Sequence, residues 1–182
     1  MSTFRFAIMG AGNIAHQFCD AVTLVEDCEV SAIASKDLGR AQKFAEECSV
    51  AHAYDNYEQM LIEEKPDCVY IAVTPNDHFR LTMLCLEHHV PVLCEKAMFT
   101  NSAEAKAVFE KAEKDQTFVM EAMWSRFLPA VNQAKKWAAE GKIGRLEALQ
   151  GRIGFLAPEG ADNRYHSPLL CGGAATDITV YA

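Results

Sequence analysis

The sequence has no apolar run long enough to cross a membrane and no excess of basic residues. Its apolar runs fall short of the about 18 residues that a membrane-spanning helix needs. Its 17 lysine and arginine residues are outnumbered by 25 aspartate and glutamate residues, so the formal net charge is −8. A chain of this charge repels phosphate backbones and acidic lipids. We therefore expect no nucleic-acid partner and no membrane partner.

The sequence also lacks paired cysteine motifs and an export signal. Its seven cysteines are odd in number and scattered, without the Cys-x-x-Cys spacing that is typical of zinc and redox sites. We expect reduced cysteines and no metal site. The start shows no positively charged region followed by an apolar segment and a cleavage site. These absences favour a cytoplasmic protein.

What the sequence does have is enough apolar material for a sizeable core. Half of its 182 residues are hydrophobic and 23% are charged. Domains contain about 100–200 residues, so this length allows one full domain and part of a second. We expect a globular chain.

The stretch 4–15 predicts a strand, a glycine turn and the start of a helix. A helix N-terminus carries unpaired N–H groups and partial positive charge, so it can hold a pyrophosphate. Gly10 would make the turn, Gly12 would let phosphate approach the backbone, and Ala15 would allow close packing of helix and strand. The alternative is a chance glycine turn. We predict a dinucleotide-binding loop in which Gly10, Gly12, Asn13 and Ile14 contact the cofactor.

Predicted strands and helices then alternate along the chain up to residue 122. Apolar runs and alternation place strands at 4–9, 29–35, 50–54, 67–73, 90–94 and 117–122. The segments between them have helical periodicity, and the run at 67–73 is apolar enough for a strand that is covered on both faces. This order predicts an α/β fold with a Rossmann-type, doubly wound parallel sheet in residues 1–122.

The end of the second predicted strand favours NADP over NAD. In NAD-binding units an acidic residue about 20 residues beyond the glycines takes the ribose hydroxyls, but this strand ends in Ser35 and Lys36, with Arg40 one turn further on. A hydroxyl, an ammonium and a guanidinium would hold a 2′-phosphate, which a carboxylate would repel. The alternative is that Lys36 and Arg40 are solvated charges at a helix start.

Two further strand ends carry polar residues where open α/β sheets bind ligands. Thr74, Asn76 and His78 follow the strand at 67–73, and Glu95 and Lys96 follow the strand at 90–94. We predict that these five residues contact the cofactor. For His78, a cap or a surface position is an equal alternative.

The pattern changes beyond residue 122. We predict a helix at 127–140, a strand at 145–155, a loop at 156–171 and the beginning of a helix at 174–181. One strand and a helix that has only begun cannot form an independent domain, because even an isolated hairpin is marginal in water. We expect residues 123–182 to be part of something longer, or to be completed by partners.

Several motifs together resemble one enzyme family. They are Gly10-Ala-Gly-Asn-Ile-Ala15, Thr74-Pro-Asn76, Leu93-Cys-Glu-Lys96, Met120-Glu-Ala-Met-Trp-Ser-Arg126 and Gly172-Gly-Ala-Ala-Thr-Asp-Ile-Thr-Val-Tyr181. This set resembles the glucose-fructose oxidoreductase / inositol dehydrogenase (Gfo/Idh/MocA) family over nearly the whole chain. Within it, the run that begins at Glu121 and the tyrosine four residues after Asp177 resemble the branch of dimeric dihydrodiol dehydrogenases and NADP-dependent D-xylose dehydrogenases.

The resemblance implies a second domain with a mostly antiparallel sheet, used for substrate binding and dimerisation. Residues 123–182 would be its beginning, with 145–155 as the first strand, and the domain would be incomplete in this chain. A homodimer would form through the missing sheet. The sequence departs from the family pattern at three positions: Ala97 replaces a proline after the lysine, Cys171 replaces the first of three glycines, and Thr179 replaces a glycine next to the substrate.

Hydride transfer from an alcohol leaves a proton that a base must take, and the cofactor supplies no such base. Tyr181 is the candidate base. A free phenol has a pKa near 10, and a nearby ammonium such as that of Lys96 favours the phenolate. Asp177 lies four residues before Tyr181, so on a helix it would share a face with it and could hold a substrate hydroxyl or orient Lys96. The alternative is structural: a solvated lysine, a helix-start charge and a core aromatic.

By resemblance, Trp124, Arg126 and Phe155 line the substrate pocket, although aromatic residues at domain junctions are commonly packing residues. The expected function is NADP-dependent oxidation or reduction of a CH–OH group in a sugar, cyclic polyol or trans-dihydrodiol. The alternative is a dinucleotide-binding sensor or regulatory subunit without turnover, which Ala97 and Thr179 favour.

Overall fold

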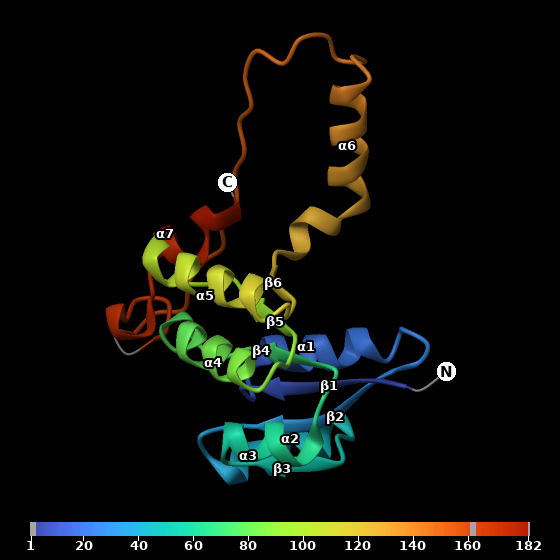
Figure 1. Cartoon of the computed structure of the whole chain (residues 1–182). Helices are drawn as coiled ribbons and strands as arrows, with labels where there is room; N and C mark the ends of the chain where they lie inside the picture. The colour runs from blue at the N-terminus through green and yellow to red at the C-terminus, as the bar shows by residue number, and fades with distance from the viewer. Residues whose placement is uncertain (1–2, 161–162, 182) are drawn as a thin grey trace. The chain divides into compact units, whose positions relative to one another are not determined.

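The chain divides into two compact units, Met1–Glu121 and Ala122–Ala182. The computed structural model describes residues 3–160 and 163–181. The first unit contains the sheet and the five helices that cover it (Figure 1). The second unit consists of short helical segments joined by irregular chain.

The first unit is built on a six-stranded sheet with the order β3-β2-β1-β4-β5-β6. The strands are β1 (Phe4–Met9), β2 (Cys28–Ala34), β3 (His52–Tyr54), β4 (Cys68–Ile71), β5 (Val92–Glu95) and β6 (Val119–Ala122). β1 pairs in parallel with both β2 and β4, and the pairs β2–β3 and β4–β5 are also parallel. The predicted Rossmann-type order is confirmed: the chain runs outward from β1 to β3, then returns to add β4 on the other side of β1.

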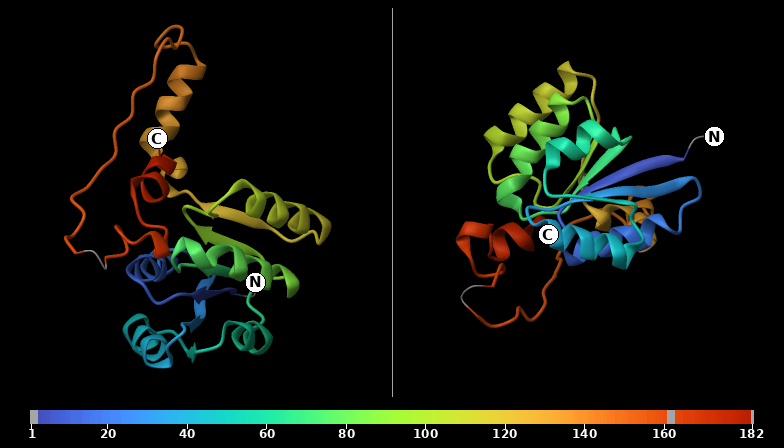
Figure 2. Two further views of the ribbon diagram at one scale, coloured as in Figure 1. Left: turned by 90° about the vertical axis from the view of Figure 1, so that its left-hand side faces the viewer. Right: turned by 90° about the horizontal axis from the view of Figure 1, so that it is seen from below.

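Helices cover both faces of this sheet. They are α1 (Asn13–Val22), α2 (Leu38–Cys48), α3 (Tyr57–Glu64), α4 (Pro75–Glu87) and α5 (Ser102–Lys114). α1 and α2 lie on one face, and α3, α4 and α5 lie on the other (Figure 2). All four residues of β4 are buried, as its continuous apolar run predicts for a central strand.

Polar caps explain where three of these helices begin. The side-chain oxygens of Asp37, Asn56 and Asn101 accept hydrogen bonds from backbone N–H groups in the first turns of α2, α3 and α5. Glu104, three residues after the N-cap Asn101, accepts a hydrogen bond from the N–H of Thr100, the residue before the cap, at 3.0 Å. Phe109 has helical spacing with Ala112 but is 48% exposed, whereas Val108 and Ala112 are buried in a cluster with Leu86 of α4.

The second unit contains α6 (Pro129–Ala139), the short helix α7 (Ala174–Asp177) and the 3₁₀ segments η1 (Trp124–Phe127), η2 (Pro168–Leu170) and η3 (Thr179–Tyr181). The helix expected at 127–140 is therefore present and begins at Pro129. The helix expected at 174–181 is interrupted at Ile178, between α7 and η3. The loop predicted at 156–171 includes residues 161 and 162, which lie outside the described residues. Its described residues are mostly irregular, as predicted.

The strand predicted at 145–155 is wrong, since these residues are irregular and exposed. A strand needs a neighbour to complete its backbone hydrogen bonds, and the described part of the second unit contains no strand that could pair with it. Alternating apolar residues are therefore not sufficient for a strand here. Within the described ranges, no helix combines the length and the apolar character that a membrane crossing requires.

Candidate functional site

Gly10 makes a turn at the carboxyl end of β1 that only glycine can make. Its φ is +108°, and a Cβ atom there would lie 2.7 Å from the carbonyl oxygen of Ala72, just beyond β4. The N–H of Gly10 donates to the carbonyl oxygen of Ala34, at the end of β2, at 2.8 Å. The turn is thereby fixed between β2 and β4, where the strand order of the sheet changes direction. Open α/β sheets bind ligands at this point.

The N-terminus of α1 follows this turn and has no side-chain cap among the described residues. Gly12 is the N-cap residue, in extended conformation, whereas α2, α3 and α5 are capped by side chains. Asn13 and Ile14, the first two helical residues, are exposed. Uncapped N–H groups and the partial positive charge of a helix start can hold an anion such as a pyrophosphate.

The three residues predicted to select NADP lie beside this turn with different exposures. Ser35 is buried, and its N–H donates to the carbonyl oxygen of Tyr54 at 3.0 Å. The side chain of Lys36 is 65% exposed, and its Nζ lies 2.5 Å from Oδ2 of Asp77. Arg40 reaches back toward the glycine loop, with Nη2 3.4 Å from the carbonyl oxygen of Ala11. Lys36 and Arg40 thus provide two cations next to the predicted cofactor loop.

The structure adds two charged residues, Asp77 and Arg80, that the sequence reasoning missed. Asp77 lies in the first turn of α4, and its Oδ1 is 3.5 Å from Nη2 of Arg80. Burial favours a raised pKa for Asp77, but the hydrogen bond and charge of Lys36, followed by the charge of Arg80, outweigh it and lower the pKa below its usual value. The sequence could have indicated that Asp77 lies near Lys36, because Asp77 follows the strand β4, Lys36 follows β2, and parallel strands end at one edge of the sheet.

His78 joins two loops at this edge of the sheet. Its side chain is fully buried, with Nε2 3.0 Å from the carbonyl oxygen of Val73 and Nδ1 3.0 Å from that of Ala97. Burial lowers the pKa of His78, against the effect of these backbone carbonyls. The imidazole therefore connects the loop after β4 to the loop after β5. Thr74 ends the first of these loops as the N-cap of α4, and the exposed Asn76 is the second residue of that helix.

A buried carboxylate supports the strand end that carries Lys96. Glu95 accepts a hydrogen bond from the hydroxyl of Tyr70 at 2.6 Å and another from the N–H of Lys96 at 3.2 Å. Burial raises the pKa of Glu95, although the hydrogen bond from Tyr70 works in the opposite direction. The Lys96–Ala97 peptide bond is cis. Lys96 itself is half-buried at the carboxyl end of β5, the edge that also carries Gly10 and Lys36.

The second unit joins the candidate base to a candidate substrate residue. Nε1 of Trp124 donates to the hydroxyl oxygen of Tyr181 at 2.8 Å, and the two rings meet edge to face with their centroids 5.9 Å apart. Asp177 ends α7, so Asp177 and Tyr181 do not share one continuous helix. Arg126 and Phe155 are exposed, and the ring of Phe155 contacts that of Tyr165. Lys96 belongs to the first unit, so its pairing with Tyr181 stays a prediction.

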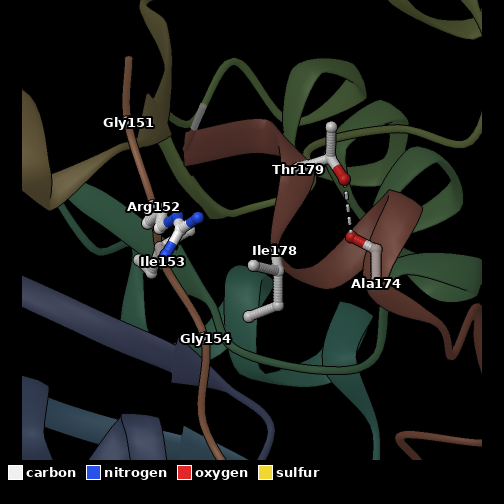
Figure 3. Close-up of a pocket in the computed structure, with 7 residues that line it drawn as sticks. All are labelled: Gly151, Arg152, Ile153, Gly154, Ala174, Ile178 and Thr179. Atoms are coloured by element: carbon white, nitrogen blue, oxygen red, sulfur yellow. Dashed lines mark hydrogen bonds between the residues drawn. The ribbon is translucent and has the colours of Figure 1, made fainter.

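A pocket of about 570 Å³ lies within the second unit (Figure 3). Arg152 contributes a cationic side chain to its lining, and Ile178 contributes an apolar one. Thr179 also lines it, and the Thr179 hydroxyl donates to the carbonyl oxygen of Ala174 at 2.9 Å, as the dashed line in Figure 3 marks. The hydroxyl at this position, where the family pattern predicts glycine, is thus directed to the backbone.

Residues 4–123 match a family described as an oxidoreductase family with an NAD-binding Rossmann fold. The trans-1,2-dihydrobenzene-1,2-diol dehydrogenase of Mus musculus is 36% identical to this chain over 182 residues, which cover 97% of the chain and 53% of the mouse protein. The chain thus spans about half the length of the curated relatives that it matches.

Solved structures share the fold. An NAD-binding protein from Listeria innocua matches with a TM-score of 0.87 and 22% identity, over 99% of this chain and 52% of its own. A 3-ketoreductase from Actinomadura kijaniata, solved with TDP-benzene and NADP, matches with a TM-score of 0.71 and 26% identity. That match covers 77% of this chain and 43% of the ketoreductase.

Proposed function

Because the chain belongs to the oxidoreductase family with an NAD-binding Rossmann fold, we propose that it transfers hydride between NADP and a CH–OH group of a sugar, a cyclic polyol or a trans-dihydrodiol. The family predicted from the motifs is thereby confirmed, whereas the cofactor's phosphate, the substrate and the catalytic residues are proposals. The turn at Gly10, which leads into the uncapped N-terminus of α1, is the observation that carries this function.

The residues at the sheet edge fit a dinucleotide. Gly12, Asn13 and Ile14 would hold the pyrophosphate through backbone N–H groups at the start of α1. Gly10, whose own N–H is bonded to Ala34 and which has no room for a Cβ beside Ala72, would make the turn that brings these groups to the cofactor. The remaining residues proposed to line the cofactor site are Thr74, Asn76, His78, Glu95 and Lys96. When bound, the nicotinamide ring supplies the site that accepts or gives the hydride.

NADP is proposed over NAD on the charge at the end of β2. Ser35 places no carboxylate there, and the side chains of Lys36 and Arg40 offer an ammonium and a guanidinium within reach of the glycine loop. Charge-assisted hydrogen bonds to a phosphate are about twice as strong as neutral ones. A 2′-phosphate would therefore gain more from these side chains than a 2′-hydroxyl would.

Proton transfer is assigned to Tyr181, with Lys96 and Asp177 as the charged residues that assist it. Tyr181 would take the proton of the substrate hydroxyl, and the Lys96 ammonium would stabilise the phenolate. Asp177 would hold a neighbouring substrate hydroxyl or orient Lys96. The indole N–H of Trp124, donated to the Tyr181 oxygen, supports this assignment because it also stabilises negative charge on that oxygen.

The substrate class is proposed from the second unit and from the relatives. Trp124, Arg126 and Phe155 offer two exposed aromatic surfaces and a cation, which suit a ring that carries hydroxyl groups. The similar mouse protein is named for a trans-dihydrodiol of benzene, and one neighbour of the same fold, from Lactobacillus casei, was solved with scyllo-inositol. We also propose a cytoplasmic homodimer.

Lys96→Met provides the test. We expect turnover of aldoses, cyclic polyols or dihydrodiols with NADP⁺, followed by the absorbance of reduced cofactor, to fall by roughly 10²–10⁴-fold. The dissociation constant for NADP⁺ should stay within about threefold, because the phosphates are held elsewhere. Lys106→Met, which removes an exposed lysine paired with Glu110 on α5, is the matched control.

Two outcomes would contradict the proposal in different ways. Turnover that survives Lys96→Met would remove Lys96 from the chemistry. Tight NADP binding without turnover of any member of the panel by a protein with a complete second domain would favour the sensor instead of the dehydrogenase.

A further inference from the structure

Lys36, proposed to hold the 2′-phosphate, already has an anionic partner. Asp77 approaches Lys36 from the first turn of α4, the helix that follows β4, while the ammonium comes from the segment just after β2. Their atoms are 2.5 Å apart, and the Asp77 side chain is only 17% exposed. This contact crosses the edge of the sheet beside the glycine loop.

We propose that Asp77 is a specificity-determining residue that weakens the preference for NADP over NAD. The proposal rests on the proposed dinucleotide function and concerns one property of it, the ratio of the affinities for NADP and NAD. A bound 2′-phosphate would have to share the Lys36 ammonium with the Asp77 carboxylate, and the two anions would repel each other. A 2′-hydroxyl has no such competition.

The other charges around Lys36 do not cancel this effect. Arg80 contacts the opposite oxygen of Asp77 at 3.5 Å and keeps the carboxylate ionised together with Lys36. Asp37 accepts from the N–H of Arg40 at 2.7 Å, so its carboxylate caps α2. Asp77 is therefore the carboxylate whose contact with Lys36 the phosphate would have to replace.

Asp77 also has the chemistry that NAD-binding units use at this position. Such units place a carboxylate at the end of the second strand, where it accepts hydrogen bonds from the ribose hydroxyls. Here that strand ends in Ser35 and Lys36, and a carboxylate from the neighbouring loop reaches the same ammonium. An ionised Asp77 can accept from a ribose hydroxyl of NAD, so the same side chain opposes NADP and assists NAD.

Asp77→Asn tests the inference by calorimetric titration of the 182-residue chain with NADP⁺ and with NAD⁺. We expect the dissociation constant for NADP⁺ to fall roughly fivefold and that for NAD⁺ to stay constant or rise, since the variant removes one negative charge beside the Lys36 ammonium, whose side chain is 65% exposed. Glu110→Gln on α5 makes the same change in net charge far from β2 and should alter neither constant.

A double-mutant cycle with Lys36→Met separates this inference from the proposed cofactor. Lys36→Met should weaken NADP⁺ binding, and in that background Asp77→Asn should lose its gain because the shared ammonium is gone. If Lys36→Met leaves NADP⁺ affinity unchanged, the phosphate site itself is wrong. If Lys36→Met weakens NADP⁺ but Asp77→Asn does not tighten it, only the role of Asp77 is overturned.

A second variant covers the case in which Asp77→Asn perturbs α4. Asp77→Ser retains a residue that is favoured near helix starts, and its circular dichroism spectrum reports whether the helices are intact. A folded Asp77→Ser chain with an unchanged ratio of the two dissociation constants would overturn the inference, whereas the expected shift of the ratio toward NADP supports it.

Discussion

The two units of this chain differ in how much they bury. All buried hydrophobic residues in the described ranges lie between Ala7 and Ala112, in the first unit. In the second unit, the described residues after position 121 are exposed or half-buried, including Trp137 of α6, which is 46% exposed. The first unit thus has its own core, and the second is held by local turns and short helices.

This difference separates the two halves of the proposed site. The dinucleotide residues stand on strand ends whose positions are fixed by the packed sheet, such as Gly10 between Ala34 and Ala72. The proposed base, Tyr181, stands on a three-residue 3₁₀ segment, with Trp124 as its hydrogen-bonding partner. Cofactor binding should therefore depend on the first unit alone, and turnover on both.

The largest expected effect is on the core of the first unit. Phe44 of α2 is 1% exposed and contacts the ring of His16. Phe44→Ala should lower the free energy of unfolding by about 3–5 kcal/mol, because it leaves a cavity as well as losing apolar burial. Urea unfolding followed by circular dichroism measures this. Trp137→Ala in the second unit should lower the free energy of unfolding by under about 1 kcal/mol. Equal losses for the two variants would contradict the inference that only the first unit has a packed core.

An intermediate effect is expected at the turn of Gly10. Gly10→Ala should destabilise the first unit by about 2–4 kcal/mol, since the left-handed backbone strain adds to a clash with a backbone oxygen. It should also abolish NADP⁺ binding in a fluorescence titration. Gly141 of the second unit has a φ of +70° but no atom within 4 Å of an added Cβ. Gly141→Ala should therefore lower the free energy of unfolding by about 1–2 kcal/mol through backbone strain alone, and the variant should still bind NADP⁺.

The smallest expected effect is a dependence on pH that comes from His78. Its pKa is lowered by burial, so the unfolded chain takes up a proton first as the pH falls. His78 thus contributes stability above its unfolded pKa of about 6.5, and this contribution is lost as the pH falls through the lowered pKa of the folded chain.

Thermal unfolding between pH 7 and pH 5 measures this slope. His78→Gln should flatten it even if the variant is less stable at every pH, because the glutamine does not titrate. His166→Gln, at an exposed histidine of the second unit, is the matched control. An unchanged slope in His78→Gln would assign the acid sensitivity to other groups.

Periodicity predicted the first unit well because each of its elements is amphipathic or wholly apolar and is covered by its neighbours. The strands predicted at 4–9 and 67–73 illustrate this, since their ends agree with the structure to within two residues. Phe109 shows the limit of periodicity, since it is spaced for the apolar face of α5 and is nevertheless 48% exposed. Helical spacing marks every apolar residue on a face, while the packing of α5 against α4 decides which of them is covered.

The prediction for residues 145–155 failed for a related reason. Alternating apolar residues describe a strand only if a second strand supplies hydrogen bonds, and the described residues of the second unit offer none. Likewise, the four-residue spacing of Asp177 and Tyr181 predicted a shared helical face, but the backbone changes from α7 to η3 between them. Local spacing cannot anticipate such a break.

The cofactor-binding strand ends could be found from the sequence because each follows an apolar strand and carries polar residues. The contact between Lys36 and Asp77 could not, since the two residues are 41 positions apart and meet only when β2 and β4 are placed on either side of β1. The three carbonyl partners of His78 were hidden in the same way, because they lie on the loops after β4 and β5.

By itself the sequence determined the glycine loop, the alternation of strands and helices, and hence the family and the dinucleotide fold. These features depend on hydrophobic periodicity and on the steric freedom of glycine, which act between residues near one another in the chain. The tertiary structure decided which charges oppose one another at the sheet edge, which histidine is buried and which apolar residues stay exposed. Those outcomes depend on Coulomb forces and burial, which act through space and are fixed only when distant segments pack together.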